Sequence, residues 1–191
     1  EIFPDPKNKI VLDLCAAPGG KSTLLANYFN EGLVVSNETI KSRNAILVEN
    51  ITKWGSDRVV VTQNDPSHFK ALPNFFDLLV VDAPCSGSGL FRKDPDAINE
   101  WSEESVLHCS TRQERILEDS VDTLKEGGYL IYSTCSYSFE ENEKIMERLE
   151  YFNKLDEWKC CIAFMDTDLG KGVETTSMVF RTDYFLNIFP D

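Results

Sequence analysis

The sequence predicts an α/β fold, in which a doubly wound, mostly parallel sheet carries helices on both faces. Five short apolar runs are typical of strands buried on both sides, and turn signals or helical patterns separate them. The runs are Lys9–Cys15, Leu33–Asn37, Arg58–Thr62, the apolar part of Phe75–Pro84, and Tyr129–Cys135. Strands that alternate with helices build βαβ units, so these runs should lie side by side in one sheet.

Helical patterns fill the first connections between these runs. Gly19 and Gly20 break the first strand, and a helix is expected to begin at Ser22 and to reach Asn30. The second connection has apolar residues three or four apart, with one polar position at Asn44, which indicates another helix. Its apolar residues are Ile40, Leu47, Ile51 and Trp54.

The second half of the chain shows two further helical patterns. A long helix should follow Ser102, and Gly127-Gly128 should end that connection. Its apolar face would consist of Val106, Cys109, Ile116, Leu117, Val121 and Leu124. Ser138 and Glu141 have the S-x-x-E spacing of a capping box, which should open a last helix. That helix would bury Ile145, Met146, Leu149 and Phe152, and weaker strand patterns follow at Lys159–Met165 and Met178–Phe189.

Length and composition suit a single domain over residues 1–191. The chain is 42% hydrophobic and 27% charged, which favours a full core over disorder, and no apolar run is long enough to span a bilayer. Six cysteines, without a secretory signal or a C-x-x-C pair, indicate reduced thiols in the cytoplasm and no metal site. The net charge of −13 argues against extensive polyanion binding by this chain alone, because phosphate contacts need basic side chains.

The stretch DLCAAPGGKST, Asp13 to Thr23, resembles a nucleotide-binding P-loop that ends in Gly20-Lys21-Ser22. LLVVD, Leu78–Asp82, would then be a Walker B strand whose aspartate reaches Mg²⁺. The first glycine of the P-loop is missing, however, because Cys15 stands there, and Pro18 removes an amide donor. A plain strand-to-helix turn is another interpretation, but it accounts for the glycines only.

The same loop fits the first turn of a Rossmann-like nucleoside site. Glu38 directly follows Leu33–Asn37, 18 residues after Gly20, where an acid can take ribose hydroxyls. Asp65 follows the third strand and could face the edge of a base. A ligand with adenosine but no phosphates needs no wrapping P-loop, which points to S-adenosylmethionine.

Two cysteines and an aspartate stand at the ends of neighbouring predicted strands. DAPCSGSG, Asp82–Gly89, places Asp82 three residues before Cys85, and STCS places Cys135 at the end of the fifth strand. Ligands bind beyond the carboxyl ends of such strands, so these segments should meet the Cys15–Lys21 loop in one cleft. A lone cysteine is usually a small buried hydrophobe. The cysteines interpreted in that way are Cys15, Cys109, Cys160 and Cys161.

Methylation of cytosine at carbon 5 needs this set of groups. A thiolate that adds to carbon 6 makes carbon 5 nucleophilic, and an acid at ring N3 makes the addition easier. A base then removes the carbon 5 proton and the thiol is eliminated. The residues provide a holder for each role without deciding which cysteine attacks. An inactive module of the same fold that only binds a partner is the alternative, and the presence of both Cys85 and Cys135 argues against it.

Three motifs together resemble the Sun-type (RsmB/RsmF-like) RNA cytosine-5 methyltransferases. They are DLCAAPGGK, DAPCSGSG and STCSYSFEENE, and their order and spacing agree with the family from about Lys9 to Leu149. FRKDPDAINEWS, Phe91–Ser102, is similar to the bacterial branch that methylates 16S ribosomal RNA. The resemblance implies a Rossmann-like class I methyltransferase fold, S-adenosylmethionine as cofactor, and ribosomal RNA or a ribosomal subunit as partner.

The resemblance also implies the roles of the catalytic residues. Cys135 would be the nucleophile on carbon 6, and Cys85 would assist release of the methylated product. Asp82 would contact N3 and the amino edge of the cytosine, at the border of the cofactor site. The assignment of Cys135 as nucleophile rests on the family, because DNA cytosine methyltransferases use the cysteine of the other motif.

For the cofactor, the resemblance implies contacts from three strand ends. Glu38 would take the ribose hydroxyls with Arg43 as its companion, and Asp65 would hold the adenine. A loop would surround the methionine part of the cofactor, and it consists of Cys15, Ala16, Ala17, Pro18, Gly19, Gly20 and Lys21.

Family members usually carry an RNA-positioning segment before the first strand and a glycine-rich strand after the last one. We therefore expect residues 1–191 to be an excised catalytic domain whose full-length protein has a flanking RNA-binding domain. Arg92 and Lys93 are expected to meet a phosphate beside the target base, and Phe91 and Trp101 either stack on nucleotides or pack within the protein. The target nucleotide and the oligomeric state leave no signal in the sequence.

Overall fold

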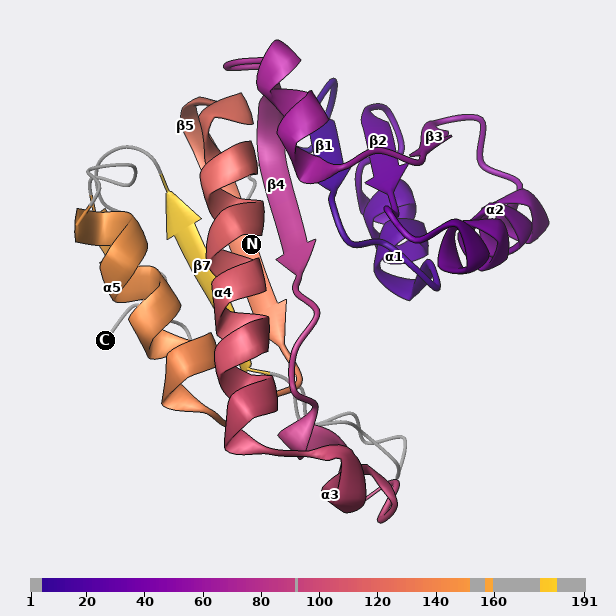
Figure 1. The fold of residues 1–191 in the computed structure, drawn as a ribbon. Helices are drawn as coiled ribbons and strands as arrows, with labels where there is room; N and C mark the ends of the chain where they lie inside the picture. The colour runs from indigo at the N-terminus through magenta and orange to yellow at the C-terminus, as the bar shows by residue number, and fades with distance from the viewer. Residues whose placement is uncertain (1–4, 92, 152–156, 160–175, 182–191) are drawn as a thin grey trace, which may run out of the picture.

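The computed structural model of the chain describes residues 5–91, 93–151, 157–159 and 176–181. These residues form one seven-stranded sheet with the strand order β3-β2-β1-β4-β5-β7-β6 (Figure 1). The parallel strands are β1 (Ile10–Asp13), β2 (Leu33–Asn37), β3 (Val59–Thr62), β4 (Phe76–Asp82) and β5 (Leu124–Thr134). Antiparallel pairs join β7 (Thr176–Arg181) to β5 and to β6 (Glu157–Lys159). The predicted doubly wound, mostly parallel sheet is confirmed.

The strand order reverses between β1 and β4. The chain first builds outward from β1 through β2 to β3, and then crosses back to place β4 and β5 on the other side of β1. Leu12 pairs with Val35 of β2 on one side and with Leu79 of β4 on the other. A crevice opens at such a reversal, beyond the carboxyl ends of the strands, and ligands of open α/β sheets bind there.

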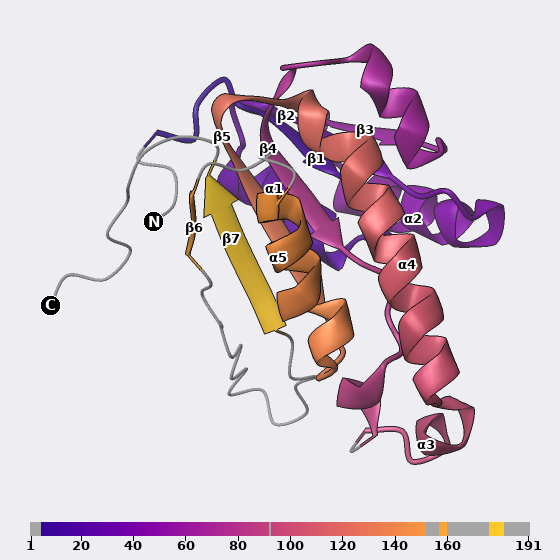
Figure 2. The same ribbon diagram turned by 60° about the vertical axis from the view of Figure 1, so that its left-hand side comes forward.

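Helices cover both faces of the sheet, as Figure 2 shows. They are α1 (Gly20–Tyr28), α2 (Lys41–Trp54), α4 (Glu103–Ser120) and α5 (Glu143–Tyr151), while the short α3 (Ala97–Glu100) lies beyond the strand ends beside the 3-10 turn Ser88–Leu90. Ala26 of α1 packs with Val11 and Val34 on one face. Leu12, the next residue along β1, belongs to the core on the other face with Leu117 of α4. The central strands β1 and β4 are therefore buried on both sides, which explains their solid apolar runs, whereas the edge strand β3 leaves Val60 exposed.

Two helices have boundaries that differ from the prediction. Helix α1 begins at Gly20 and not at Ser22, directly after Gly19 with a φ of 113°, and it ends at Tyr28 and not at Asn30. Helix α4 ends at Ser120, so Val121 lies in a 3-10 turn and Leu124 begins β5. Leu124 pairs with Phe76, and the register then shifts, because Gly127 adopts a φ of 74° and lets the strand bulge.

The predicted capping box is wrong. Ser138 precedes a 3-10 turn, Phe139–Glu141, and its side chain makes no capping hydrogen bond. Helix α5 begins two residues after Glu141, at Glu143, and the Glu141 carboxylate bonds to other loops. The predictions for Phe152, most of Lys159–Met165 and residues 182–189 lie outside the described residues.

Candidate active site

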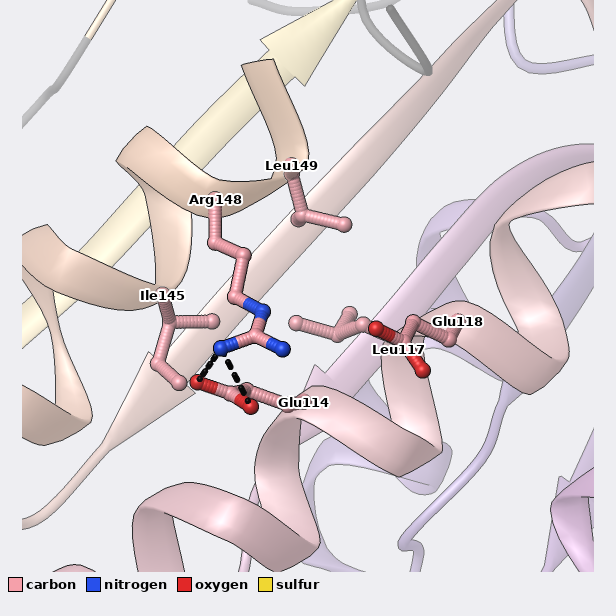
Figure 3. A pocket seen from close by; sticks show the side chains of 6 residues that line it. All are labelled: Glu114, Leu117, Glu118, Ile145, Arg148 and Leu149. Carbon is pink, nitrogen blue, oxygen red and sulfur yellow. Dashed lines mark hydrogen bonds and ion pairs between the residues drawn. The ribbon is translucent and has the colours of Figure 1, made fainter. Parts of the chain in front are cut away.

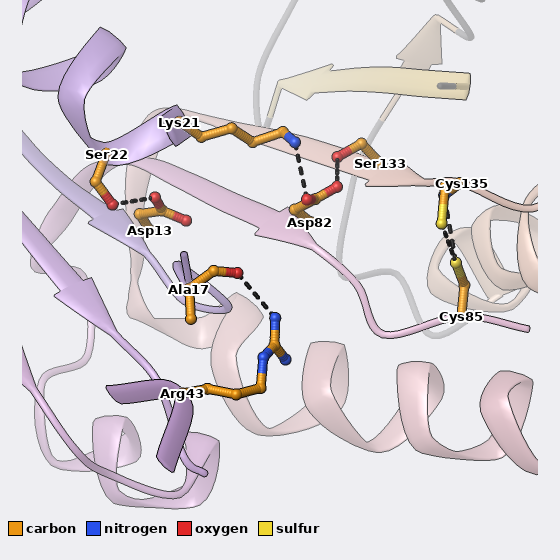
Figure 4. A network of polar contacts seen from close by, with 9 residues as sticks. All are labelled: Asp13, Ala17, Lys21, Ser22, Arg43, Asp82, Cys85, Ser133 and Cys135. Carbon is orange, nitrogen blue, oxygen red and sulfur yellow. Dashed lines mark hydrogen bonds and ion pairs between the residues drawn. The ribbon is translucent and has the colours of Figure 1, made fainter. Parts of the chain in front are cut away.

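The ends of β1, β4 and β5 bring three predicted segments together (Figure 4). The Nζ atom of Lys21, in the first turn of α1, lies 2.8 Å from Asp82 Oδ2 at the end of β4. The hydroxyl of Ser133 on β5 donates to Asp82 Oδ1 at 2.7 Å. Asp82 is thus held from both sides, and its side chain remains 37% exposed, so that a ligand in the crevice can reach it.

Two free thiols meet beside Asp82. The Sγ atoms of Cys85, in the loop after β4, and of Cys135, directly after β5, lie 3.0 Å apart. The backbone N–H of Cys135 also donates to the sulfur of Cys85 at 3.3 Å. The sequence separates these cysteines by 50 residues, and the parallel pairing of β4 with β5 brings them to the same edge of the sheet.

The short contact shifts the pKa values of the two thiols in opposite directions. The hydrogen bond between the two sulfurs, in which either could donate, lowers the pKa of the Cys135 thiol against the opposing effect of burial. The same bond raises the pKa of the Cys85 thiol, and burial adds to that rise. A pair so close titrates as one unit, in which the first proton leaves and the second is retained. A thiolate is the nucleophilic form of cysteine, so this pair offers one nucleophile and one S–H donor.

The loop before α1 is tied to α2. The carbonyl of Ala17 accepts from Arg43 at 2.8 Å, and the carbonyl of Pro18, after a cis peptide bond, accepts from Asn50 at 2.7 Å. Ala16 and Ala17 are buried with Leu47 of α2. The loop therefore has a fixed path from Cys15 to Lys21, and burial raises the pKa of the Cys15 thiol far above its usual range, which leaves it protonated.

Glu38 and Asp65 occupy different environments. Glu38 is 4% exposed, its Oε1 accepts from the N–H of Ile40, and its Oε2 lies 3.3 Å from Arg43. Asp65 follows β3 and begins a 3-10 helix (Pro66–Ala71), where one oxygen accepts from the N–H of Ser67. The hydroxyl of Ser67 donates to the same oxygen at 2.7 Å, and this bond, followed by the one from the N–H, lowers the pKa of Asp65 and keeps it ionised.

The buried acids of the crevice fit S-adenosylmethionine. Asp13 Oδ1 and Glu38 Oε2 are buried oxygens at the ends of β1 and β2, and neither accepts a hydrogen bond from the described residues, although Glu38 Oε2 forms the ion pair with Arg43. Buried acceptors of this kind need donors, and the cofactor carries hydroxyl and ammonium groups. S-adenosylmethionine has no phosphate group, so the loop needs no phosphate-binding role.

The geometry disfavours the NTPase interpretation. The Ser22 hydroxyl, which would bind Mg²⁺ in a P-loop, is fully buried and donates to Asp13 at 2.6 Å. Lys21, which would bind phosphate, is held by Asp82. Both P-loop side chains thus serve the protein itself.

One site residue was missed by the sequence reasoning. Glu141 is fully buried, and its carboxylate accepts hydrogen bonds from Ser86, after Cys85, and from Ser136, after Cys135. Its S-x-x-E spacing suggested a helix cap instead. The signal that could have found it is the serine directly after each of the two cysteines, since two buried hydroxyls need an acceptor.

The remaining predicted residues lie around this site or outside the described residues. Phe91 and Trp101 pack edge to face, with ring centroids 6.3 Å apart, which favours the packing interpretation. Lys93 is exposed, and Cys109 is buried on α4. Arg92, Cys160 and Cys161 lie outside the described residues.

Other kinds of site find little support in the described part of the chain. A pocket between α4 and α5 is lined by apolar side chains and the Glu114–Arg148 ion pair, and no residue of the candidate site lines it (Figure 3). The described residues hold no group of three or more metal-binding side chains. Within the same residues, no helix has both the length and the apolar character needed to cross a membrane.

Comparisons with known proteins show which proteins the chain is similar to. The chain is 38% identical over 184 residues to a protein of Aliivibrio fischeri named ribosomal RNA small subunit methyltransferase F, and 37% identical over 182 residues to the protein of that name in Escherichia coli O157:H7. The first match covers 95% of this chain and 37% of the relative, and the second covers 94% and 36%. The chain thus spans little more than a third of the length of these curated relatives.

Solved structures share the fold. A methyltransferase homologue from Pyrococcus horikoshii matches with a TM-score of 0.70 and 27% identity, over 92% of this chain and 62% of that one. NSun6 from Pyrococcus horikoshii, solved with SFG, matches with a TM-score of 0.76 and 24% identity, over 95% and 49%. The family model described as 16S rRNA methyltransferase RsmB/F matches residues 2–190. The chain therefore belongs to this RsmB/F family of S-adenosylmethionine-dependent rRNA methyltransferases.

Proposed function

We propose that this chain is the catalytic domain of an enzyme that methylates carbon 5 of a cytosine in RNA, with 16S ribosomal RNA as substrate. The observation that carries the proposal is the pair of free thiols 3.0 Å apart, next to an aspartate at the cofactor crevice. A single methyl transfer to a strong nucleophile would need no thiol. Carbon 5 of cytosine is a weak nucleophile, so it needs a thiolate added at carbon 6.

In the proposed reaction, Cys135 supplies that thiolate. The S–H of Cys85 favours ionisation of Cys135, and the new bond joins the Cys135 sulfur to carbon 6. Asp82 receives the N3 and amino edge of the base, while Lys21 and Ser133 fix its carboxyl group. When bound, S-adenosylmethionine supplies the methyl group that carbon 5 takes. The target cytosine must leave any base stack to reach the thiol.

Release reverses the first bond. A base removes the carbon 5 proton, the electron pair re-forms the ring double bond, and the Cys135 sulfur leaves as a thiolate. A thiol leaves faster when its thiolate is stabilised. Cys85 donates its S–H to that sulfur and so assists release, which explains why two thiols are held together.

The proposed holders of the cofactor are those that the family resemblance implies, and their positions around the crevice support them. Glu38 accepts the ribose hydroxyls with Arg43 beside it, Asp65 lies at the adenine, and the Cys15–Lys21 loop surrounds the methionine part. A flanking RNA-binding domain in the full-length protein would hold the RNA, in the cytoplasm where ribosomal RNA is assembled.

Replacement of the two cysteines tests the mechanism. The Cys85→Ala variant should accumulate a covalent RNA adduct, because release loses its S–H donor while attack by Cys135 continues. The measurement is a gel shift of protein with 16S ribosomal RNA under denaturing conditions, in the presence of S-adenosylmethionine. Cys135→Ala is the matched control and should form no adduct. An adduct in Cys135→Ala, or its absence in Cys85→Ala, would contradict the assigned roles.

A further inference from the structure

A buried carboxylate, Glu141, joins the two loops that carry the thiols. The side chain is fully buried and lies in the turn before α5. Its Oε1 accepts from the backbone N–H of Ser86 at 2.8 Å and from Gln113 Nε2 at 3.1 Å. Its Oε2 accepts from the hydroxyls of Ser86 and Ser136, both at 2.5 Å. Four donors from three separate elements thus meet on one carboxylate.

These contacts fix the residues on both sides of Cys85. Ser86 follows the cysteine and bonds to Glu141 through its N–H and its hydroxyl. Pro84 precedes it, and its carbonyl accepts from Gln113 at 2.9 Å. Gln113 in turn donates to Glu141, so one pair of side chains holds the whole Cys85 peptide segment.

The partner loop is held by the same turn. Ser136, directly after Cys135, donates to Glu141, and its carbonyl accepts from Asn142 Nδ2 at 2.9 Å. Glu141 is itself fixed, because its carbonyl accepts from the buried hydroxyl of Tyr132 on β5 at 2.8 Å. The spacing of the two sulfurs is therefore set by a rigid frame and not by the thiols alone.

We propose that Glu141 is a positioning residue that holds Cys85 and Cys135 at the separation that the covalent steps require. It touches neither the base nor the cofactor, and it acts through Ser86, Ser136 and Gln113. The inference rests on the proposed function, because the distance between the two sulfurs matters for catalysis only if both thiols take part in the reaction.

A carboxylate is the group that this position needs. An ionised carboxylate only accepts hydrogen bonds and can take four of them, whereas a glutamine amide offers one accepting oxygen and two donors. In Glu141→Gln, the oxygen could keep the N–H of Ser86 and Gln113, while the hydroxyls of Ser86 and Ser136 would have to rotate and accept. Glu141→Ala would remove the acceptor that all four donors share, leaving Gln113 with the carbonyl of Pro84 and the hydroxyls of Ser86 and Ser136 with each other. The two variants therefore remove the hydrogen bonds of Glu141 to different extents, with a single residue changed in each.

The experiment compares these variants with Asp77→Asn in the full-length protein. Asp77 is a matched control, because its carboxylate is also mostly buried and accepts from a backbone N–H, that of Ile10, and from Lys125. It lies near the start of β4, away from the thiols at the other end. Asp77→Asn should lower the melting temperature and leave thiol reactivity and turnover unchanged. Ser136→Ala removes a single donor and serves where Glu141→Ala does not fold.

The main readout is the pH dependence of alkylation of Cys135 by iodoacetamide, followed by peptide mass spectrometry. The charges of Asp82 and Glu141 both raise the pKa of this thiol, so loss of the Glu141 charge alone would shift the alkylation midpoint to lower pH. Loss of the close Cys85 contact acts in the opposite direction, since that contact lowers the pKa. A positioning role thus predicts a shift to higher pH in Glu141→Ala and, to a smaller extent, in Glu141→Gln and Ser136→Ala.

Turnover gives the second readout. At saturating S-adenosylmethionine and 16S ribosomal RNA, kcat of Glu141→Ala should fall about 100-fold, as expected for a small misplacement of reacting groups, with KM for the cofactor unchanged. A shift of the alkylation midpoint to lower pH, or an unchanged midpoint with wild-type kcat, would overturn the proposal. Alkylation needs no RNA, so failure of Cys85→Ala to form an adduct would contradict the proposed function and leave the positioning role to be decided by the alkylation midpoint.

Discussion

At the scale of single residues, Asp13 is a carboxylate whose ionised form is destabilised by burial in the crevice. It is fully buried at the end of β1, accepts from Ser22 alone, and keeps a second oxygen without a partner among the described residues. Burial raises its pKa from 3.8 to about 6, with a smaller contribution from the nearby Asp82. The native protein therefore takes up a proton here when the pH falls below about 6.

The pH dependence of stability should report this residue. Because the native pKa is raised, the native state binds more protons than the unfolded state between pH 4 and 6, and the free energy of unfolding falls as pH rises through that window. A shift of this size corresponds to about 3 kcal/mol. Asp13→Asn cannot ionise, so its stability relative to wild type should improve by about that amount from pH 4 to pH 7.

Urea unfolding of both proteins across this pH range is the measurement. The comparison within one variant pair removes the contribution of all other titrating groups, because those groups are shared. Parallel stability curves for wild type and Asp13→Asn would show that the buried carboxyl is not the group that takes up the proton.

At the scale of elements, the junction of β1 with α1 depends on one backbone conformation. Gly19 has a φ of 113°, a backbone angle that residues with a side chain rarely adopt. A Cβ there would lie 3.1 Å from Leu47 Cδ1 of α2. The next glycine is different, because a Cβ at Gly20 would meet no atom within 4 Å and Gly20 is already helical. The backbone angle and the nearby Leu47 thus require a glycine at position 19, whereas neither constraint applies at position 20.

Alanine substitution at each glycine should separate these reasons. Gly19→Ala forces the strained backbone angle and crowds Leu47, so it should destabilise the protein by about 1–2 kcal/mol. Gly20→Ala is the control and should be neutral or slightly stabilising, since alanine favours a helix by up to about 1 kcal/mol over glycine. Denaturant midpoints measure both. Equal losses for the two variants would argue against a special role of the Gly19 conformation.

At the scale of the whole molecule, the acidic net charge conflicts with the binding of RNA that the proposed function needs. The chain has a net charge of −13, yet its proposed substrate is a polyanion. The proposed resolution is a division of labour, in which this domain supplies the chemistry and a flanking domain supplies most contacts to phosphate. The chain spans about 37% of the first curated relatives, which leaves room for such a domain in proteins of this family.

RNA binding at different salt concentrations should show this division. The full-length protein should bind 16S ribosomal RNA more tightly than residues 1–191, and its affinity should fall more steeply with salt, because each neutralised phosphate releases counterions. Filter binding or fluorescence anisotropy over a salt series measures both slopes. Equal affinities and equal slopes would place the phosphate contacts within residues 1–191 instead.

The sequence by itself predicted the parallel strands, the helices and a set of candidate site residues, because buried parallel strands read as solid apolar runs and short motifs mark the strand ends. The tertiary structure decided how those residues meet. It placed Cys85 against Cys135, closed Asp82 between Lys21 and Ser133, and turned Glu141 from a predicted helix cap into a link between two loops. Local periodicity carries no information about contacts between residues 50 positions apart, since strand pairing and packing alone set those distances.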